Sequence, residues 1–144
     1  MQAGDYVRCN FPFREVAGPG ASPHIVFCLA TGRIRDERFA IVVYTTSRVA
    51  FEGSRRPRQH LLVDTSRAAE LGQAASFHVD VSRVARLPFH PDYFPDMRDG
   101  VIPTFGRDRS FIETVVKRQR ELMESGFRIT PVDLVSRSHP NSSS

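Results

Sequence analysis

Cysteine is scarce in this sequence, and its two cysteines, Cys9 and Cys28, lack the CxxC spacing of a metal or redox motif. Both stand in apolar stretches, so we expect two buried, reduced thiols. No apolar run approaches the ~18 residues of a membrane span. The first residues, Met-Gln-Ala-Gly-Asp, show no signal-peptide pattern. The sequence therefore predicts a soluble cytoplasmic protein without membrane contact.

Motifs that bind metals or nucleotide cofactors are also missing. No HExxH, paired CxxC, P-loop or GxGxxG pattern occurs. His24, His60 and His78, together with several acidic residues, invite a zinc interpretation, but their spacing fits no zinc motif. We therefore predict no metal and no cofactor.

Lysine is nearly absent, because the 20 basic residues are nineteen arginines and Lys117. The formal net charge is +4 and the sequence pI is about 9.7. The planar arginine fork matches phosphate and stacks on bases, so this bias suits an RNA-binding protein. Coding bias in a GC-rich genome would produce the same composition, and charge alone does not identify a nucleic-acid-binding protein.

Length and composition are those of one globular domain. The chain has 144 residues, of which 40% are hydrophobic and 25% charged. A domain of this size can bury a core without a disulfide or a metal. We predict a single domain over residues 1–135 and a disordered polar tail over 136–144.

Short apolar or alternating segments predict mainly β-structure. In the segment 5–11, Val7, Cys9 and Phe11 alternate with Tyr6, Arg8 and Asn10, which is the pattern of a half-buried strand. Further strands are expected at 24–30, 38–45, 60–63, 77–81 and 84–87.

The connecting segments and helices follow from capping and turn residues. A loop is expected at 14–22, a charged turn at 31–37, a polar loop at 51–58 and irregular structure at 90–104. Thr65 or Ser66 could cap a short helix through Leu71, and one long helix is expected from Arg107 to Gly126. Such a set of elements suggests a small antiparallel barrel or curled sheet.

An ordered series of short motifs runs through the N-terminal half. In chain order, separated by a Gly/Pro loop and a short turn, they are Gly4-Asp5, Phe11-Pro12-Phe13, Ser22-Pro23 and Thr45-Thr46-Ser47. Their order and spacing over roughly residues 4–88 resemble the PemK/MazF family of toxin endoribonucleases. The resemblance implies a mainly β, SH3-like barrel with a terminal helix, usually dimeric. It further implies metal-independent cleavage of single-stranded RNA and inhibition by a cognate antitoxin protein.

The same resemblance assigns candidate site residues. Thr46 falls on the family's catalytic threonine, and Ser47 on a neighbouring motif position. Ser22 stands where the family carries its catalytic arginine, directly before the proline. Arg14, at the mouth of the Gly-rich loop, or Arg48, after the Thr-Ser pair, could supply the missing guanidinium.

Metal-free RNA cleavage needs a base, an acid and donors that stabilise charge on the phosphate oxygens. Thr46 could donate its hydroxyl to such an oxygen, and a histidine titrates near neutrality, so His24 could act as base or acid. Asp80 and Arg83 align loosely with acidic and basic positions of some family members. Each of these residues could instead be an ordinary strand or surface residue.

Several polar residues could contact the RNA backbone and bases. The arginines around Pro57 form a local basic cluster that could grip phosphates, although a solvated loop would look the same. Phe11, Phe13 and Tyr44 could stack on bases or belong to the core. The candidate RNA-binding residues are Ser22, Ser47, Arg48, Arg55, Arg56 and Arg58.

Three interpretations stay open at this point. The leading one is a sequence-selective endoribonuclease that acts as the toxin of a toxin–antitoxin pair. The second is a catalytically silent barrel of the same type that binds RNA or a protein partner, and Ser22 favours it. The third is an unrelated β-barrel, which the absence of a groove beside Thr46 would favour.

Overall fold

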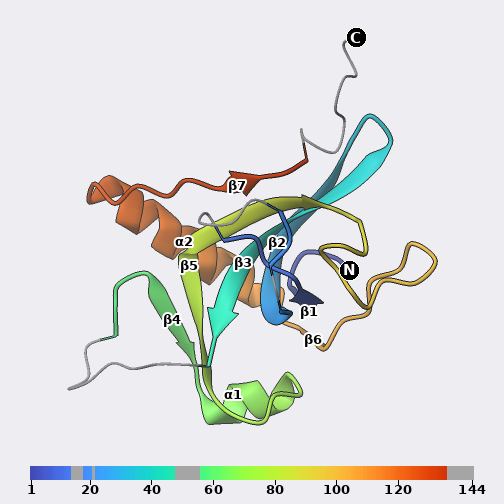
Figure 1. The fold of residues 1–144 in the computed structure, drawn as a ribbon. Helices are drawn as coiled ribbons and strands as arrows, with labels where there is room; N and C mark the ends of the chain where they lie inside the picture. Colours follow the sequence, from blue (N-terminus) through green and yellow to red (C-terminus); the bar gives the residue numbers. More distant parts are fainter. Residues whose placement is uncertain (14–17, 21, 48–55, 136–144) are drawn as a thin grey trace.

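The computed structural model describes residues 1–13, 18–20, 22–47 and 56–135. It is mainly β, as the sequence predicted. The strands are β1 (Asp5–Cys9), β2 (His24–Ile34), β3 (Glu37–Thr46), β4 (His60–Val63), β5 (Phe77–Pro88), β6 (Gly106–Arg107) and β7 (Val132–Asp133), and the helices are α1 (Thr65–Glu70) and α2 (Ser110–Glu124) (Figure 1).

One seven-stranded sheet has the order β4-β5-β3-β2-β1-β6, with β7 added beside β5. Every pairing is antiparallel except that of β7 with β5, which is parallel. In the part of the chain that is described, no pairing joins β4 to β6. The described strands therefore form an open sheet, where the sequence suggested a small barrel or a curled sheet and the family resemblance implied an SH3-like barrel.

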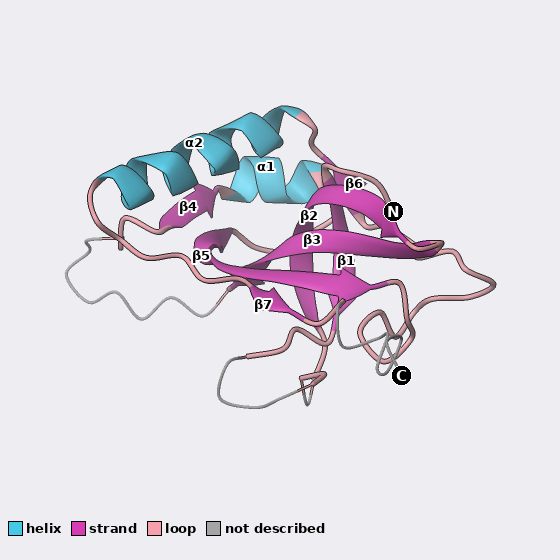
Figure 2. Cartoon of the chain, turned by 90° about the horizontal axis from the view of Figure 1, so that it is seen from above, coloured by secondary structure: helices cyan, strands magenta, loops and turns pink. Residues whose placement is uncertain are grey.

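The two sides of the sheet are covered differently. Both helices lie on the same side, which we call the helix face (Figure 2). The core there includes Tyr6, Phe27, Val43, Val79, Val115 and Leu122. The opposite side, the loop face, packs against the segment 89–102, and its core includes Val7, Val26, Val42, Leu87, Phe94 and Ile102. Hydrophobic side chains are thus buried on both sides of the central strands.

Strand β1 is buried on both faces, where the sequence predicted one exposed face. Tyr6, expected to be exposed, is only 1% exposed and packs against Phe27 and Phe77. The polar alternation was misleading because the helix-face core extends across β1. Cys9 and Cys28 are buried, reduced thiols, as predicted. Burial is the main reason that the pKa of Cys28 rises to about 12.

The predicted turn at 31–37 is wrong in length. Strands β2 and β3 continue almost to one another, and only Arg35 and Asp36, with φ of 52° and 71°, form the turn. Two consecutive residues with positive φ match the twist of paired strands. Gly32 belongs to the ladder opposite Phe39, whose ring occupies the space that a side chain at position 32 would need.

The two strands predicted at 77–81 and 84–87 are one bent strand, β5. Its register with β3 passes from Val43 opposite Val84 to Tyr44 opposite Asp80. Three residues of β5, 81–83, therefore bulge out of the ladder. The Gln119 side chain of α2 donates a hydrogen bond of 3.0 Å to the Val81 carbonyl, so this helix holds the bulge in place.

Helix α1 is capped one residue earlier than predicted. The Asp64 carboxylate, not Thr65 or Ser66, accepts the capping hydrogen bond, from the Arg67 backbone N–H at 2.9 Å. A carboxylate is an effective N-cap because it satisfies an otherwise unpaired helical N–H. In the described part of the chain, neither helix has the length and apolar character needed to span a membrane.

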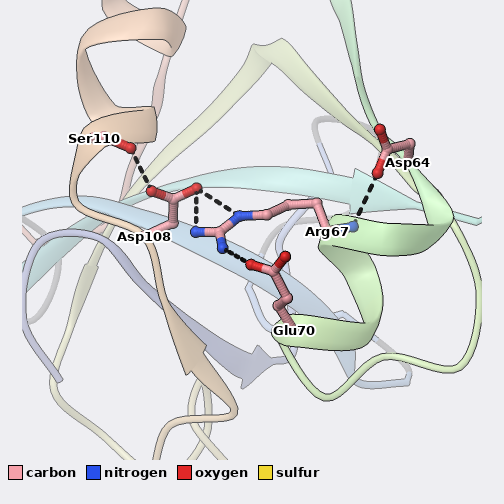
Figure 3. A network of polar contacts seen from close by, with 5 residues as sticks. All are labelled: Asp64, Arg67, Glu70, Asp108 and Ser110. Atoms are coloured by element: carbon pink, nitrogen blue, oxygen red, sulfur yellow. Dashed lines mark hydrogen bonds and ion pairs between the residues drawn. The ribbon is translucent and has the colours of Figure 1, made fainter.

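Polar contacts fasten α1 to the start of α2 (Figure 3). The Arg67 guanidinium donates to Asp108 at 2.7 and 3.1 Å and also to Glu70. The Ser110 hydroxyl donates to the other Asp108 oxygen at 2.6 Å. Burial acts to raise the pKa of Asp108, but the hydrogen bonds from Ser110 and Arg67 outweigh it and hold that pKa below its usual value.

The long helix starts later than Arg107, where the sequence predicted it. Gly106 and Arg107 pair with β1 instead, and the Arg107 guanidinium donates to the buried Asp5 carboxylate at 2.5 Å. Gly126, with φ of 92°, ends the helix as expected. The short strands β6 and β7 were not predicted, because two-residue strands carry no periodic pattern.

Candidate functional site

Polar side chains gather on the loop face where four strands meet. The register pairs Tyr44 with Asp80 and Thr46 with His78, and His60 with Asp80. Residues between them, such as Val79 and Leu61, belong to the helix-face core. We call the set the polar row; its members are His24 of β2, Tyr44 and Thr46 of β3, His78 and Asp80 of β5, and His60 of β4.

The first cavity, of about 330 Å³, lies at the end of β3, and we call it the threonine cavity. It is lined by His24, Tyr44, Thr46 and Ser47, together with the segment 73–75. Continuing the β2–β3 register from Val26 opposite Tyr44 brings His24 level with Thr46. The structure thus brings together three residues that were predicted separately from sequence: Thr46, His24 and Ser47.

The neighbouring Thr45 has a structural role. Its hydroxyl donates a hydrogen bond of 2.6 Å to the Ile25 carbonyl, and its side chain is buried. This contact ties the end of β3 to the start of β2, which carries His24. Both threonines of the motif line the threonine cavity, and Thr45 in addition fixes the strand end through this hydrogen bond.

Two further histidines adjoin Thr46 through β5 and β4. The rings of His78 and His60 are 5.5 Å apart in an edge-on arrangement. His78 is 7% exposed, and burial, with the nearby His60 and Arg56, lowers its pKa. The lowered pKa favours the neutral form of His78, which can accept a proton. Within the described ranges, no three His, Cys, Asp or Glu side chains are grouped to hold a metal ion.

A second cavity, of about 340 Å³, lies beside the β5 bulge, and we call it the arginine cavity. Asp80 and Arg83 line this cavity and not the threonine cavity. The Arg83 Nε lies 3.6 Å from Asp80 Oδ2, and His60 Nε2 lies 3.5 Å from the same oxygen. Ser82 donates to the other Asp80 oxygen from both its backbone N–H and its hydroxyl, at 3.0 and 2.6 Å.

An aromatic cluster separates the two cavities. Phe13 lines the arginine cavity and packs edge-on against His24 and Tyr44, with ring centroids 6.0 and 5.2 Å away. The Arg83 guanidinium lies 5.4 Å from the Phe13 ring centroid. Phe11 lies deeper, at 2% exposure, and belongs to the core. Phe13 of the arginine cavity therefore packs against His24 and Tyr44 of the threonine cavity.

The remaining predicted residues are more scattered. Ser22 is exposed and lines neither cavity. Arg58 donates to the Ser125 hydroxyl at 3.3 Å, so it lies beside the end of α2. Arg56 is exposed, and its charge acts on His78. Three other candidates lie outside the described residues: Arg14, Arg48 and Arg55.

Several residues in or beside the two cavities are not predicted as site residues from the sequence. His60 and His78 were considered only as metal ligands, although each alternates with apolar neighbours as Asp80 does, and that signal would have placed them with it. His60 and His78 line neither cavity. Arg128 and Thr130, in contrast, line the arginine cavity. Nothing in their local sequence indicates this, because they reach it only through the return of the chain from α2 to β7.

Comparison with protein-family models, with curated proteins and with solved structures finds no match to this chain.

Proposed function

We propose that this protein is a metal-independent endoribonuclease that cleaves single-stranded RNA. The observation that carries the proposal is the placement of Thr46 between His24 and His78. The three residues come from adjacent strands, β2, β3 and β5, on one face of the sheet, and Thr46 and His24 line a common cavity.

The chemistry is an internal transfer at phosphorus. The ribose 2′-oxygen attacks the adjacent phosphorus, the bond from phosphorus to the 5′-oxygen breaks, and the products are a 2′,3′-cyclic phosphate and a 5′-hydroxyl. A base removes the 2′-proton and an acid protonates the leaving oxygen. His78, whose lowered pKa favours the neutral form, suits the base, and His24 suits the acid. The Thr46 hydroxyl donates to a non-bridging oxygen, where negative charge develops.

The biological role in the proposal comes from the resemblance to the PemK/MazF family. On that basis the protein is the toxin of a toxin–antitoxin pair, with an SH3-like arrangement of strands and a homodimeric assembly. Its antitoxin would present an acidic segment to the arginine-rich surface, because complementary charge speeds association and selects the partner.

The test is cleavage of a long single-stranded RNA in EDTA, with mapping of the fragment ends. Thr46→Val and His24→Gln remove the proposed groups, whereas Thr31→Val and His90→Gln are matched controls away from both cavities. Losing an acid–base group costs roughly 10²–10⁴-fold in rate. We expect cyclic phosphate ends from wild type and controls, and at least a hundredfold loss in the two site variants. Equal cleavage by all five proteins would refute these roles.

A second candidate is RNA binding without cleavage. Ser22, at the family's arginine position, lies outside the threonine cavity, and among the described residues that line this cavity only His24 can carry positive charge. A filter-binding assay on the same RNA separates the candidates. Binding that weakens with salt, without any fragments from wild type, would support this second function.

A further inference from the structure

The arginine cavity combines a flat aromatic wall with cationic side chains. Phe13 is partly exposed and offers a ring surface, with the Arg83 guanidinium over it at 5.4 Å. Arg128 lines the same cavity from the segment after α2. Nucleobases stack on aromatic rings and on guanidinium planes, and phosphates pair with arginine.

The polar groups of this cavity suit a neutral heterocycle with an attached phosphate. Asp80 is the only acid among the described lining residues, and Arg83 and His60 lie against its Oδ2 atom. Because the Ser82 hydroxyl gives its proton to Asp80, its oxygen presents lone pairs. Gln59 and Thr130 add amide and hydroxyl groups that can donate or accept.

The position of the cavity relates it to the proposed cleavage centre. Its Phe13 ring packs edge-on against the His24 ring of the threonine cavity, with the two ring centroids 6.0 Å apart. A single strand of RNA passing Thr46 can therefore place the base of a neighbouring nucleotide against Phe13.

We infer that the arginine cavity is a subsite that holds the base and phosphate of a nucleotide next to the cleaved bond, and that it sets the sequence preference of cleavage. The part of this inference that concerns sequence preference rests on the proposed ribonuclease function, whereas nucleotide binding can be tested without cleavage. Arg83 thereby acts in binding, and Asp80 positions Arg83, in place of the catalytic roles suggested by sequence.

The binding test titrates AMP, GMP, CMP and UMP separately into the protein, with ribose 5-phosphate as the probe that lacks a base. Arg83→Gln and Arg128→Gln are compared with Arg86→Gln, a matched change on β5 whose guanidinium pairs with Asp133 at 2.7 Å. We expect at least one nucleotide to bind wild type and Arg86→Gln more tightly than the sugar phosphate does. Loss of a charged hydrogen bond should weaken the binding of this nucleotide roughly tenfold in Arg83→Gln and in Arg128→Gln. Thermal melts show that each variant is folded.

The specificity test sequences the ends that the same variants produce from a random RNA pool. We expect Arg83→Gln to cleave with a relaxed preference at one position beside the cut. Unchanged nucleotide affinity and unchanged end sequences in Arg83→Gln and Arg128→Gln would overturn the subsite. If wild-type protein binds a nucleotide through these arginines but never cleaves RNA, the subsite stands and the proposed function fails.

Discussion

The helix face and the loop face of the sheet are built from the same strands but differ where those strands end. On β5, Phe77 and Val79 point into the core under the helices, whereas His78 and Asp80, the alternate residues, belong to the polar row. The same contrast holds on β4 for Leu61 and His60. Because side chains alternate along a strand, His78 and Asp80 are each fixed by buried neighbours on either side of them.

The largest change in stability is expected for a substitution in the helix-face core. Phe27 is fully buried between Tyr6 and Phe111, with ring centroids 4.9 and 5.4 Å away. Phe27→Ala should lower the free energy of unfolding by about 3–5 kcal/mol, through lost burial and a cavity. Urea denaturation followed by circular dichroism measures the change. A loss under 1 kcal/mol would mean that this core is not tightly packed.

A smaller effect, a gain in the free energy of unfolding, is expected from a substitution of Tyr6. Its hydroxyl is buried in the helix-face core and has no hydrogen-bond partner among the described residues, and burial raises its pKa. Tyr6→Phe removes an unsatisfied polar group and should stabilise the protein by about 1 kcal/mol. Phe27→Leu, prepared in parallel, controls for general changes in this core. Destabilisation by Tyr6→Phe would show that the hydroxyl makes a favourable contact.

The pH dependence of stability should come in part from the loop face. Because the pKa of His78 is lowered on folding, the unfolded state binds the proton more readily. Stability is therefore full above the unfolded pKa of about 6.5 and falls as the pH drops below it. We expect the Tm of wild type to fall more between pH 7 and 5 than that of His78→Gln. His90→Gln, at an exposed histidine, should keep the wild-type slope, and equal slopes in all three proteins would contradict this origin.

The smallest stability effect is expected at Thr46 itself. Thr46→Val keeps the shape and the β-branched character of a strand end, so the free energy of unfolding should change by less than about 0.5 kcal/mol. The matched Thr45→Val loses the hydrogen bond to Ile25 and should cost about 1 kcal/mol. Urea denaturation of both variants shows which of the two substitutions lowers the free energy of unfolding more. If Thr46→Val proved the more costly, its hydroxyl would be part of the framework.

The sequence predicted most of the elements because periodicity and capping residues are local signals. The central strands, both helices and the buried cysteines follow from them. The β5 bulge and the contact of Asp80 with His60 do not, since they depend on the register between distant strands. Thr46, His24 and Ser47 were found as separate candidates, and only the β2–β3 pairing shows that they share a cavity. The arginine cavity needed the path of residues 127–132, which has no periodic pattern.

The Asp5–Arg107 pair has a consequence for folding kinetics. It joins residues 102 positions apart, whereas the β2–β3 hairpin closes through a two-residue turn. Local pairings form early, and long-range closures cost more chain entropy. We therefore expect the β1–β6 edge to form after the rate-limiting step. Arg107→Gln should then speed unfolding and leave the folding rate unchanged in stopped-flow measurements. Slower folding of this variant would show that the contact between β1 and β6 is already formed in the transition state.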